Sequence, residues 1–287
     1  KVAIKEAVTG WMDANAGQVI YNGGSEVKIP KMSVQGLGDY DRDNGYQQGG
    51  VTLEYETRKM TQDRGRKFQL DPVTTAAAVM GEFQRVFVVP EIDAYRISKI
   101  AAETIAAKKA GMVDYGYTPG ATGTSALRKI KEGIKAIREL YNGPLVIHAT
   151  PDMIMELEME LSGKITSTTF SKGGINTAVP AVDDVPILST PSNRMYTAIT
   201  LYDGKTAGQE EGGYIKGTTA KDINFFICPR TTPIAVTKQD IMRIFDPTIN
   251  QKLNAWQMDY RRFHDIWVLD NKVDSIYLNI KDAAPSA

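Results

Sequence analysis

The segment from Ser25 to Leu70 constrains the fold most, because it predicts one long β-hairpin with no core of its own. Between its two arms, residues 36–50 contain five glycines and four charged residues, and Leu37 is their one aliphatic side chain. A two-stranded ribbon alone in water is marginal, and its unpaired edges pair readily with other chains. The hairpin therefore predicts a second subunit as its partner and indicates an assembly component before an enzyme. Strand alternation carries the prediction in Val27, Ile29, Met32 and Val34 on the way in and in Val51, Leu53 and Tyr55 on the way out.

Composition removes several classes of function. Lys and Arg together number 34, as do Asp and Glu, so no global charge excess draws the chain of 287 residues to nucleic acid or to an acidic membrane. The single Cys228 excludes an intramolecular disulfide framework and a cysteine zinc site, and favours a reducing cytoplasm. The two histidines are too few for most imidazole-rich metal centres. No apolar run approaches the ~18 residues of a membrane helix, and the N-terminal segment lacks the apolar region of a signal peptide.

Helical patterns begin after the hairpin. Asp71-Pro72 predicts a helix start, and Pro90 predicts that this helix stops near Val89 and that a second helix restarts at once and closes on Gly111. A third helix is expected from Thr124, with a basic face. Residues 145–149 then predict a buried strand, and Thr150-Pro151 opens another helix, which makes an α/β unit.

The rest of the chain predicts short strands between long loops. Residues 163–182 are rich in Gly, Ser and Thr, residues 203–219 are rich in Gly, and both segments are expected to be surface loops. Short strands are expected around residues 185–188, 196–201, 223–227 and 234–236, and longer final strands between 256 and 280.

Candidate chemistry is sparse. His148 ends a predicted strand just before a helix, where α/β enzymes often place functional groups, but no Gly-x-Ser-x-Gly elbow occurs and a structural histidine is favoured. Glycines 116, 120 and 123 precede the third helix as in a phosphate loop, but no Gly-Lys-Ser/Thr ending follows them. We interpret Cys228 as a small buried side chain, and the acidic pairs at 183–184 and 210–211 as solvated turns. No catalytic, cofactor or metal residue is therefore predicted.

A local basic patch lies at the hairpin root. Residues 58–71 carry five basic side chains against two acidic ones, with Arg58, Arg64 and Arg66 among them. The patch suits phosphate or the acids of a neighbouring subunit, and its position at the root favours the neighbour.

The order of segments resembles the major capsid protein of tailed bacteriophages, the Hong Kong 97-type Johnson fold that encapsulins also use. The resemblance runs over nearly the whole chain and rests on the hairpin with its basic root followed by DRGRKFQLDPV, VVPEIDAYRISKIA, DVPILSTPSNRMYTAI and KQDIMRIFDPTINQKLNAWQMDYRRFHDIWVLDNKVDSIYLNI. It implies an α+β fold with an N-terminal arm (1–24), an extended hairpin loop (25–70), a peripheral domain with a long spine helix (71–115 and 240–287) and an axial domain (116–239).

The resemblance also implies partners. Subunits gather as hexamers and pentamers into an icosahedral shell around packaged double-stranded DNA, with scaffolding, portal and decoration proteins, without a membrane, in a virion assembled in the host cytoplasm. Some members crosslink through Lys and Asn side chains; this hairpin offers Lys28, Lys31 and Lys59, and the sequence places no acidic partner for them.

Two sets of surface residues follow from this interpretation. The expected subunit interface comprises Tyr40, Asp41, Arg42, Tyr46, Arg58, Arg64, Arg66, Glu210 and Glu211, and the expected DNA-facing residues are Arg128, Lys131 and Lys135. The alternatives are an encapsulin-like nanocompartment shell and, in a different class, an α/β enzyme that uses His148 or the glycine loop at 116–123.

Overall fold

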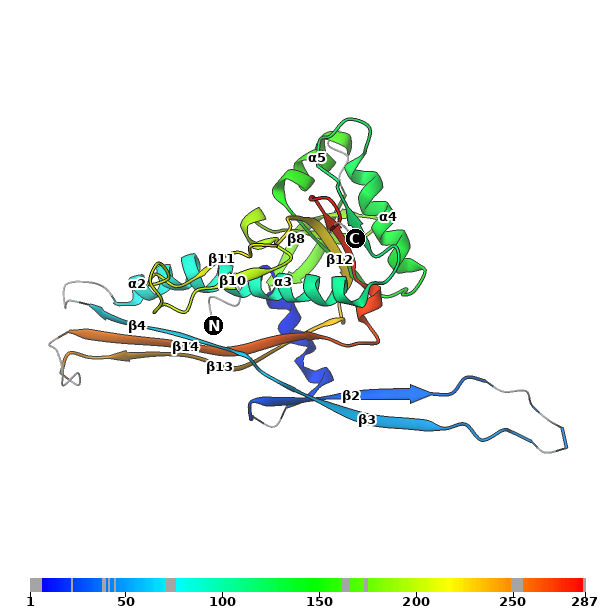
Figure 1. Cartoon of the computed structure of the whole chain (residues 1–287), viewed down its shortest axis with the longest axis horizontal. Coiled ribbons are helices and arrows are strands. Elements are labelled where there is room, and N and C mark those ends of the chain that lie inside the picture. The colour runs from blue at the N-terminus through cyan, green and yellow to red at the C-terminus, as the bar shows by residue number, and fades with distance from the viewer. Residues whose placement is uncertain are drawn as a thin grey trace.

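The computed structural model is an elongated molecule with a compact body and two long extensions (Figure 1). It describes residues 7–21, 23–37, 40, 42–43, 45–70, 76–161, 166–172, 175–248 and 255–285. One extension is a three-stranded sheet and the other is the β-hairpin, and they point to opposite ends of the molecule. Among the described residues, no helix is both long enough and apolar enough to cross a bilayer.

The body is built on a seven-stranded sheet that is buried at its centre. Its strand order is β5 (Val113–Tyr115), β15 (Tyr277–Ile280), β12 (Ile223–Pro229), β6 (Leu145–Ala149), β9 (Val185–Ser189), β8 (Ile175–Val182) and β7 (Thr166–Lys172). Every residue of β6 and β12 is buried, which confirms the predicted buried strand at 145–149. Successive side chains of a strand point to opposite faces, so both faces of these strands must be covered.

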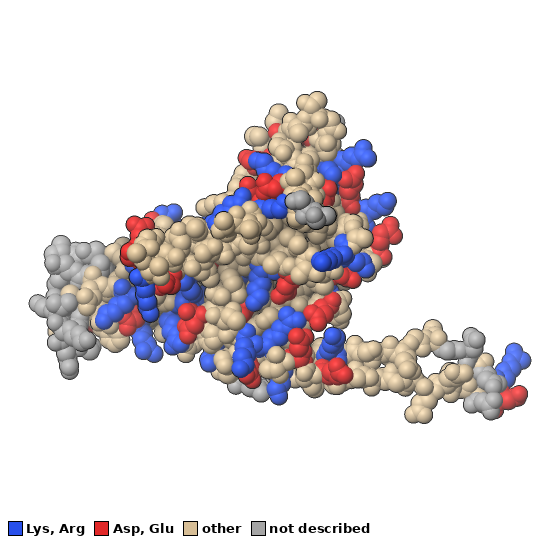
Figure 2. Space-filling model, in the orientation of Figure 1, with Lys and Arg blue, Asp and Glu red and all other residues tan. Residues whose placement is uncertain are grey.

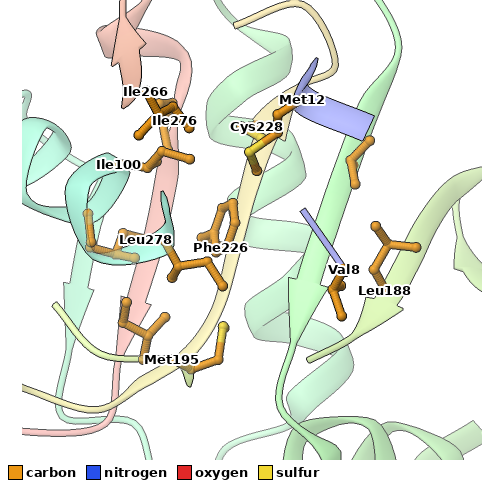
Figure 3. Close-up of a cluster of buried hydrophobic side chains, with 14 of the residues drawn as sticks. Val8, Met12, Ile100, Leu188, Met195, Phe226, Cys228, Ile266, Ile276 and Leu278 are labelled. Atoms are coloured by element: carbon orange, nitrogen blue, oxygen red, sulfur yellow. The ribbon is translucent and has the colours of Figure 1, made fainter. Parts of the chain in front are cut away.

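Helices cover the two faces of the sheet. On one face lie α4 (Ala126–Arg138) and α5 (Pro151–Leu161), which pack on Ile147, Phe225 and Ile227. On the other face lie the spine helix and the short 3-10 helix η1 (Gly10–Gln18). Figure 3 shows the cluster on this second face, where Val8 and Met12 of the N-terminal arm, Ile100 of the spine helix and Phe226 and Cys228 of β12 come together.

The prediction of a break before Pro90 is wrong, because one continuous helix runs through that position. Helix α2 (Ala76–Phe83), the π-helical turn η2 (Gln84–Val88) and α3 (Val89–Ala107) follow one another without interruption, and Val89 keeps helical angles of φ −63° and ψ −49°. We call this helix, which consists of α2, η2 and α3, the spine helix. Proline lacks an N–H donor and its ring clashes with the carbonyl four residues back; the wider π turn gives that ring room. The helix ends at Ala107, where Lys108 takes a left-handed conformation. The predicted start at Asp71-Pro72 lies outside the described residues.

The three-stranded sheet joins distant parts of the sequence. Its order is β13 (Pro233–Phe245), β14 (Trp256–Val268) and β4 (Gln62–Leu70), all antiparallel. β13 is far longer than the predicted strand at 234–236. Its outer half has no clean alternation, since Ile241, Met242 and Ile244 are all exposed, and a β-bulge between Thr237 and Gln239 shifts its register.

The β-hairpin is shorter than the expected segment from Ser25 to Leu70. Strands β2 (Glu26–Val34) and β3 (Val51–Lys59) pair with each other, and β1 (Ile20–Tyr21) pairs with the base of β2. β4 turns away from the hairpin after Met60 and pairs with β14 instead. The basic residues at 64–67 therefore belong to the three-stranded sheet rather than to the hairpin.

Two expected loops are partly strands. Residues 163–182 contain the antiparallel pair β7 and β8 at the edge of the body sheet, where Phe170 is buried under the guanidinium of Arg230. Thr166, Thr168 and Thr169 are β-branched residues that suit a strand, a signal that the Gly/Ser/Thr composition concealed. In the second segment β11 (Tyr214–Lys216) pairs with β10 (Ile199–Leu201). The remaining short helices are η3 (Ser192–Arg194) and η4 (Val273–Ser275).

Candidate functional site: the hairpin and its root

The outer half of the hairpin exposes an apolar face. Directly paired residues of neighbouring strands share a face, and three such pairs are Pro30 with Tyr55, Met32 with Leu53 and Val34 with Val51. The exposed fractions of Met32, Val34, Val51, Leu53 and Tyr55 lie between 51% and 66%. The alternate pairs on the other face, Lys31 with Glu54 and Ser33 with Thr52, are polar. We call the six residues of the three apolar pairs the outer stripe.

The inner half of the hairpin reverses this arrangement. Val27 and Ile29 are buried against the chain's own Met60 and Trp267, and they lie on the strand face opposite to Met32 and Val34. The apolar pattern thus changes face between Ile29 and Met32, which are three residues apart. The hairpin is fixed to its own body through one face and presents apolar side chains through the other.

The tip extends the exposed surface. Tyr40 and Tyr46 contact each other with ring centroids 5.0 Å apart, and their exposed fractions are 61% and 90%. Arg42 is also exposed at the tip, whereas the predicted interface residue Asp41 lies outside the described residues. Figure 2 shows a long uncharged stretch of hairpin between the charged tip and the charged root. The outer stripe lies within this uncharged stretch, and burial of its apolar side chains against another surface is favourable.

Arg58 fixes the root of the hairpin to the body. Its guanidinium lies 2.8 Å from Glu56, 3.1 Å from Asp270 and 4.0 Å from Glu103 of the spine helix. The acids that pair with this predicted interface residue are therefore supplied by the same chain.

Arg64 and Arg66 hold a surface loop over β4. Arg64 forms a two-pronged ion pair with Glu91, at 2.7 and 2.9 Å, and donates to the carbonyls of Tyr202 and Gly213. Arg66 donates to the carbonyl of Glu210 at 2.9 Å. The structure thus brings four predicted interface residues to one place, because Glu210 and Glu211 are exposed in the same loop. A cavity of about 320 Å³ lies between the loop, β4, β14 and the spine helix.

The basic face of α4 is less positive than the sequence predicts. Arg128 pairs with Glu132 at 3.0 Å, and Lys131 pairs with Asp183 at 3.2 Å. Lys135 lies on the same exposed face. The DNA-facing role of these three residues stays a prediction.

His148 lies buried in the body and is hydrogen-bonded within the chain. Its ring is fully buried and stacks on Phe226 at 4.7 Å. The indole N–H of Trp11 donates to Nε2 at 3.1 Å, and Nδ1 lies 3.0 Å from the hydroxyl of Thr190. These contacts confirm that His148 is a hydrogen-bonded buried histidine, and the absence of a catalytic role stays a prediction.

The structure also shows the surroundings of the glycine loop before α4 and of Cys228. Glu160 accepts hydrogen bonds from the backbone N–H groups of Ala126 and Leu127, so a carboxylate of the chain itself occupies the helix start where a phosphate would bind. Cys228 is fully buried, and burial raises the pKa of its thiol. Among the described residues, no cluster of His, Cys, Asp and Glu is arranged to hold a metal ion.

Solved structures share this fold. The capsid of the cyanophage P-SCSP1u matches with a TM-score of 0.59 at 11% identity, over 92% of this chain and 84% of that chain. The mature capsid of bacteriophage PhiM1 matches with a TM-score of 0.59 at 10% identity, over 91% and 83%. The virus-like particle from Pyrococcus furiosus matches with a TM-score of 0.52 at 11% identity, over 97% and 96%. No family model and no curated protein matches the sequence.

The chain has the Hong Kong 97-type capsid fold. This confirms the α+β fold class and the resemblance drawn from the order of segments. Because these identities are so low, no stretch of matched sequence carries the assignment. The arrangement of arm, hairpin, spine helix and two sheets carries it.

Proposed function

We propose that this protein is a major capsid protein that assembles with copies of itself into an icosahedral shell around double-stranded DNA. The outer stripe is the observation that carries the proposal, because its side chains are apolar, lie on one face and point away from the face that packs on the chain's own body. Full burial of such a side chain is worth about 1.5–3 kcal/mol, and roughly half of each one is still exposed, so the stripe favours association with a neighbour.

The stripe defines a matched pair of variants. Met32→Lys with Leu53→Lys places two charges on the apolar face, whereas Ser33→Lys with Thr52→Lys places two charges at the adjacent paired positions of the polar face. We expect the first variant to stay folded and to form no shells, and the second to form shells as the natural sequence does. Electron microscopy and solution mass give the result. Normal particles from the first variant would contradict the proposal.

The finer parts of the proposal concern partners and place. The fold's resemblance to phage capsids supports the domain boundaries, the hexamers and pentamers, and the scaffolding, portal and decoration proteins as partners. It also supports a virion location, assembly in the host cytoplasm and the absence of catalysis. Contact with DNA is proposed to be weak and without sequence preference, since a shell accepts any packaged sequence. Replacing Arg128, Lys131 and Lys135 by Ala should lower the salt dependence of DNA retention equally for all sequences, and a measured sequence preference would count against this.

An encapsulin-like shell is the second candidate, favoured by the likeness to the Pyrococcus furiosus particle. The nucleic acid content of purified particles separates the two, because a phage shell filled in its host holds long double-stranded DNA and a protein compartment does not.

A further inference from the structure

His264 occupies the junction between the N-terminal arm, the spine helix and the three-stranded sheet. It lies on β14, opposite Thr237 of β13 and Gln62 of β4, and its ring meets the edge of Tyr95 on the spine helix at 5.7 Å. Only 5% of its surface is exposed. The shell proposal assigns it no role.

Four cations act electrostatically on this histidine, and each belongs to an ion pair that joins two different structural elements. The pairs are Arg262 with Asp240 (2.9 Å), Arg96 with Asp13 (2.8 Å), Arg64 with Glu91 (2.7 Å) and Lys99 with Asp265 (2.9 Å). Every carboxylate among them is already paired with a cation. Other ionisable groups on the packed elements are also engaged. Asp63 pairs with Arg261, Asp93 with Arg194 and Glu103 with Arg58. Lys238 lies over the ring of Phe263, and the phenols of Tyr95 and Tyr260 donate to Asp265 and Asp240.

This junction has fewer hydrogen-bond acceptors than buried donors. The Nε atoms of Arg96 and Arg262 and the Nδ1 atom of His264 are buried without a hydrogen-bond partner in the described part of the chain. A protonated imidazole carries N–H on both ring nitrogens and one positive charge. At this position no protein group in the described part of the chain accepts from Nδ1, and the added charge has no uncommitted carboxylate.

We propose that His264 makes this junction an acid-sensitive hinge, in which a neutral ring holds the arm segment Gly10–Gln18 and β4 against the spine helix, and protonation releases them. His264, Arg64, Arg262 and Glu91 line the cavity of about 320 Å³ described above, which gives water a route to the junction. All four ion pairs join different elements, so loss of the ring's packing loosens the arm, β4 and the outer sheet together. The inference concerns the single chain and does not depend on shell assembly.

The direction of the pH effect follows from burial and from the surrounding cations. Burial, and after it the charge of Arg262, holds the pKa of His264 well below its usual value of 6.5. The open state therefore binds a proton that the closed state lacks. The junction is most stable above pH 6.5, and its opening constant rises about tenfold for each pH unit below that. The window ends near pH 5, where exposed carboxylates begin to take up protons.

Amide hydrogen exchange of the full chain between pH 7.5 and 5, corrected for the intrinsic effect of pH on exchange, tests the hinge. We expect the opening constants of residues 10–18, of β4 and of the first turns of α3 to rise about fivefold between pH 6.5 and 5.5. His264→Gln and His264→Phe cannot take up the proton and should remove this dependence while β6 and β12 behave as in the natural sequence. The same dependence in either folded variant would overturn the proposal.

A second measurement needs no variant that must fold. Only two histidines contribute ring signals, so the His264 ring can be followed by NMR in the natural protein. We expect it to stay neutral through pH 6.5 and to gain its proton only as the junction opens. A midpoint near 6.5 with unchanged exchange in residues 10–18 would overturn the proposal.

Discussion

The strand β6 and the outer half of the hairpin use similar residues in opposite ways. In β6 every residue is buried, because helices and neighbouring strands of the same chain cover both faces. In the outer hairpin Met32, Val34 and Leu53 are equally apolar and remain exposed. The difference lies in what the chain can reach: β6 completes its contacts within one subunit, and the hairpin does not. The first region determines the stability of the subunit, and we propose that the second determines its association.

Removing a ring from the body should have the largest effect on stability. Phe226→Ala deletes a fully buried side chain that stacks on His148, and we expect the free energy of unfolding to fall by about 3–5 kcal/mol. Leu53→Ala, the matched change in the outer stripe, should alter it by less than about 0.5 kcal/mol. Chemical denaturation of unassembled subunits measures both. Similar losses in the two variants would break the distinction between body and hairpin.

Shortening the hairpin should have the largest effect on assembly. Replacing residues 35–50 by Asn-Gly closes β2 on β3 with a two-residue turn that suits their pairing. The subunit should unfold at the same denaturant concentration as the natural protein and should form no shells. As a control, Tyr40→Ala with Tyr46→Ala keeps the length of the tip and tests its aromatic rings alone. Normal particles from the shortened hairpin would show that the tip makes no subunit contact.

Arg64 tests the distinction between the two regions, because the sequence predicts it at a subunit interface and the structure shows it bound to groups of its own chain. Arg64→Met leaves Glu91 and the carbonyls of Tyr202 and Gly213 without their donor. We expect the free energy of unfolding to fall by about 1–2 kcal/mol, because these bonds involve charge but the site is partly open to solvent. Lys67→Met, on the exposed surface of the same strand, is the control. An unchanged stability with lost assembly would support the prediction that Arg64 contacts a neighbouring subunit.

The sequence predicts best where one residue pattern suits one environment. The buried strand at 145–149, the helix opening at Pro151 and the exposed hairpin tip are of this kind, because apolar runs, caps and glycines act locally. The errors involve contacts between distant segments. β4 leaves the hairpin because β14, nearly two hundred residues away, offers it a partner. Pro90 continues a helix because of the π turn before it.

The outer stripe shows the same limit within one strand. The change of face is visible in the sequence, because Ile29 and Met32 are three residues apart whereas side chains on one face of a strand recur every two residues. Its meaning requires knowing that Trp267 covers the first face. The acids that pair with Arg58 and Arg64 were likewise beyond sequence reasoning, since Glu91, Glu103 and Asp270 are brought to them only by the fold.

Charge reversal in the loop over β4 should have the smallest effect on the subunit. Glu210 and Glu211 are exposed, and Arg66 binds the backbone carbonyl of Glu210 rather than its carboxylate, so Glu210→Lys with Glu211→Lys preserves that bond. We expect the free energy of unfolding to change by no more than about 0.5 kcal/mol. If the loop meets a neighbouring subunit, two reversed charges at that contact lower the yield of particles although each subunit is as stable as before. Particle yield at several salt concentrations tests this, because salt screens exposed charges and should restore part of the loss. An unchanged yield at low salt would place this loop with the body, as a surface that each subunit completes for itself.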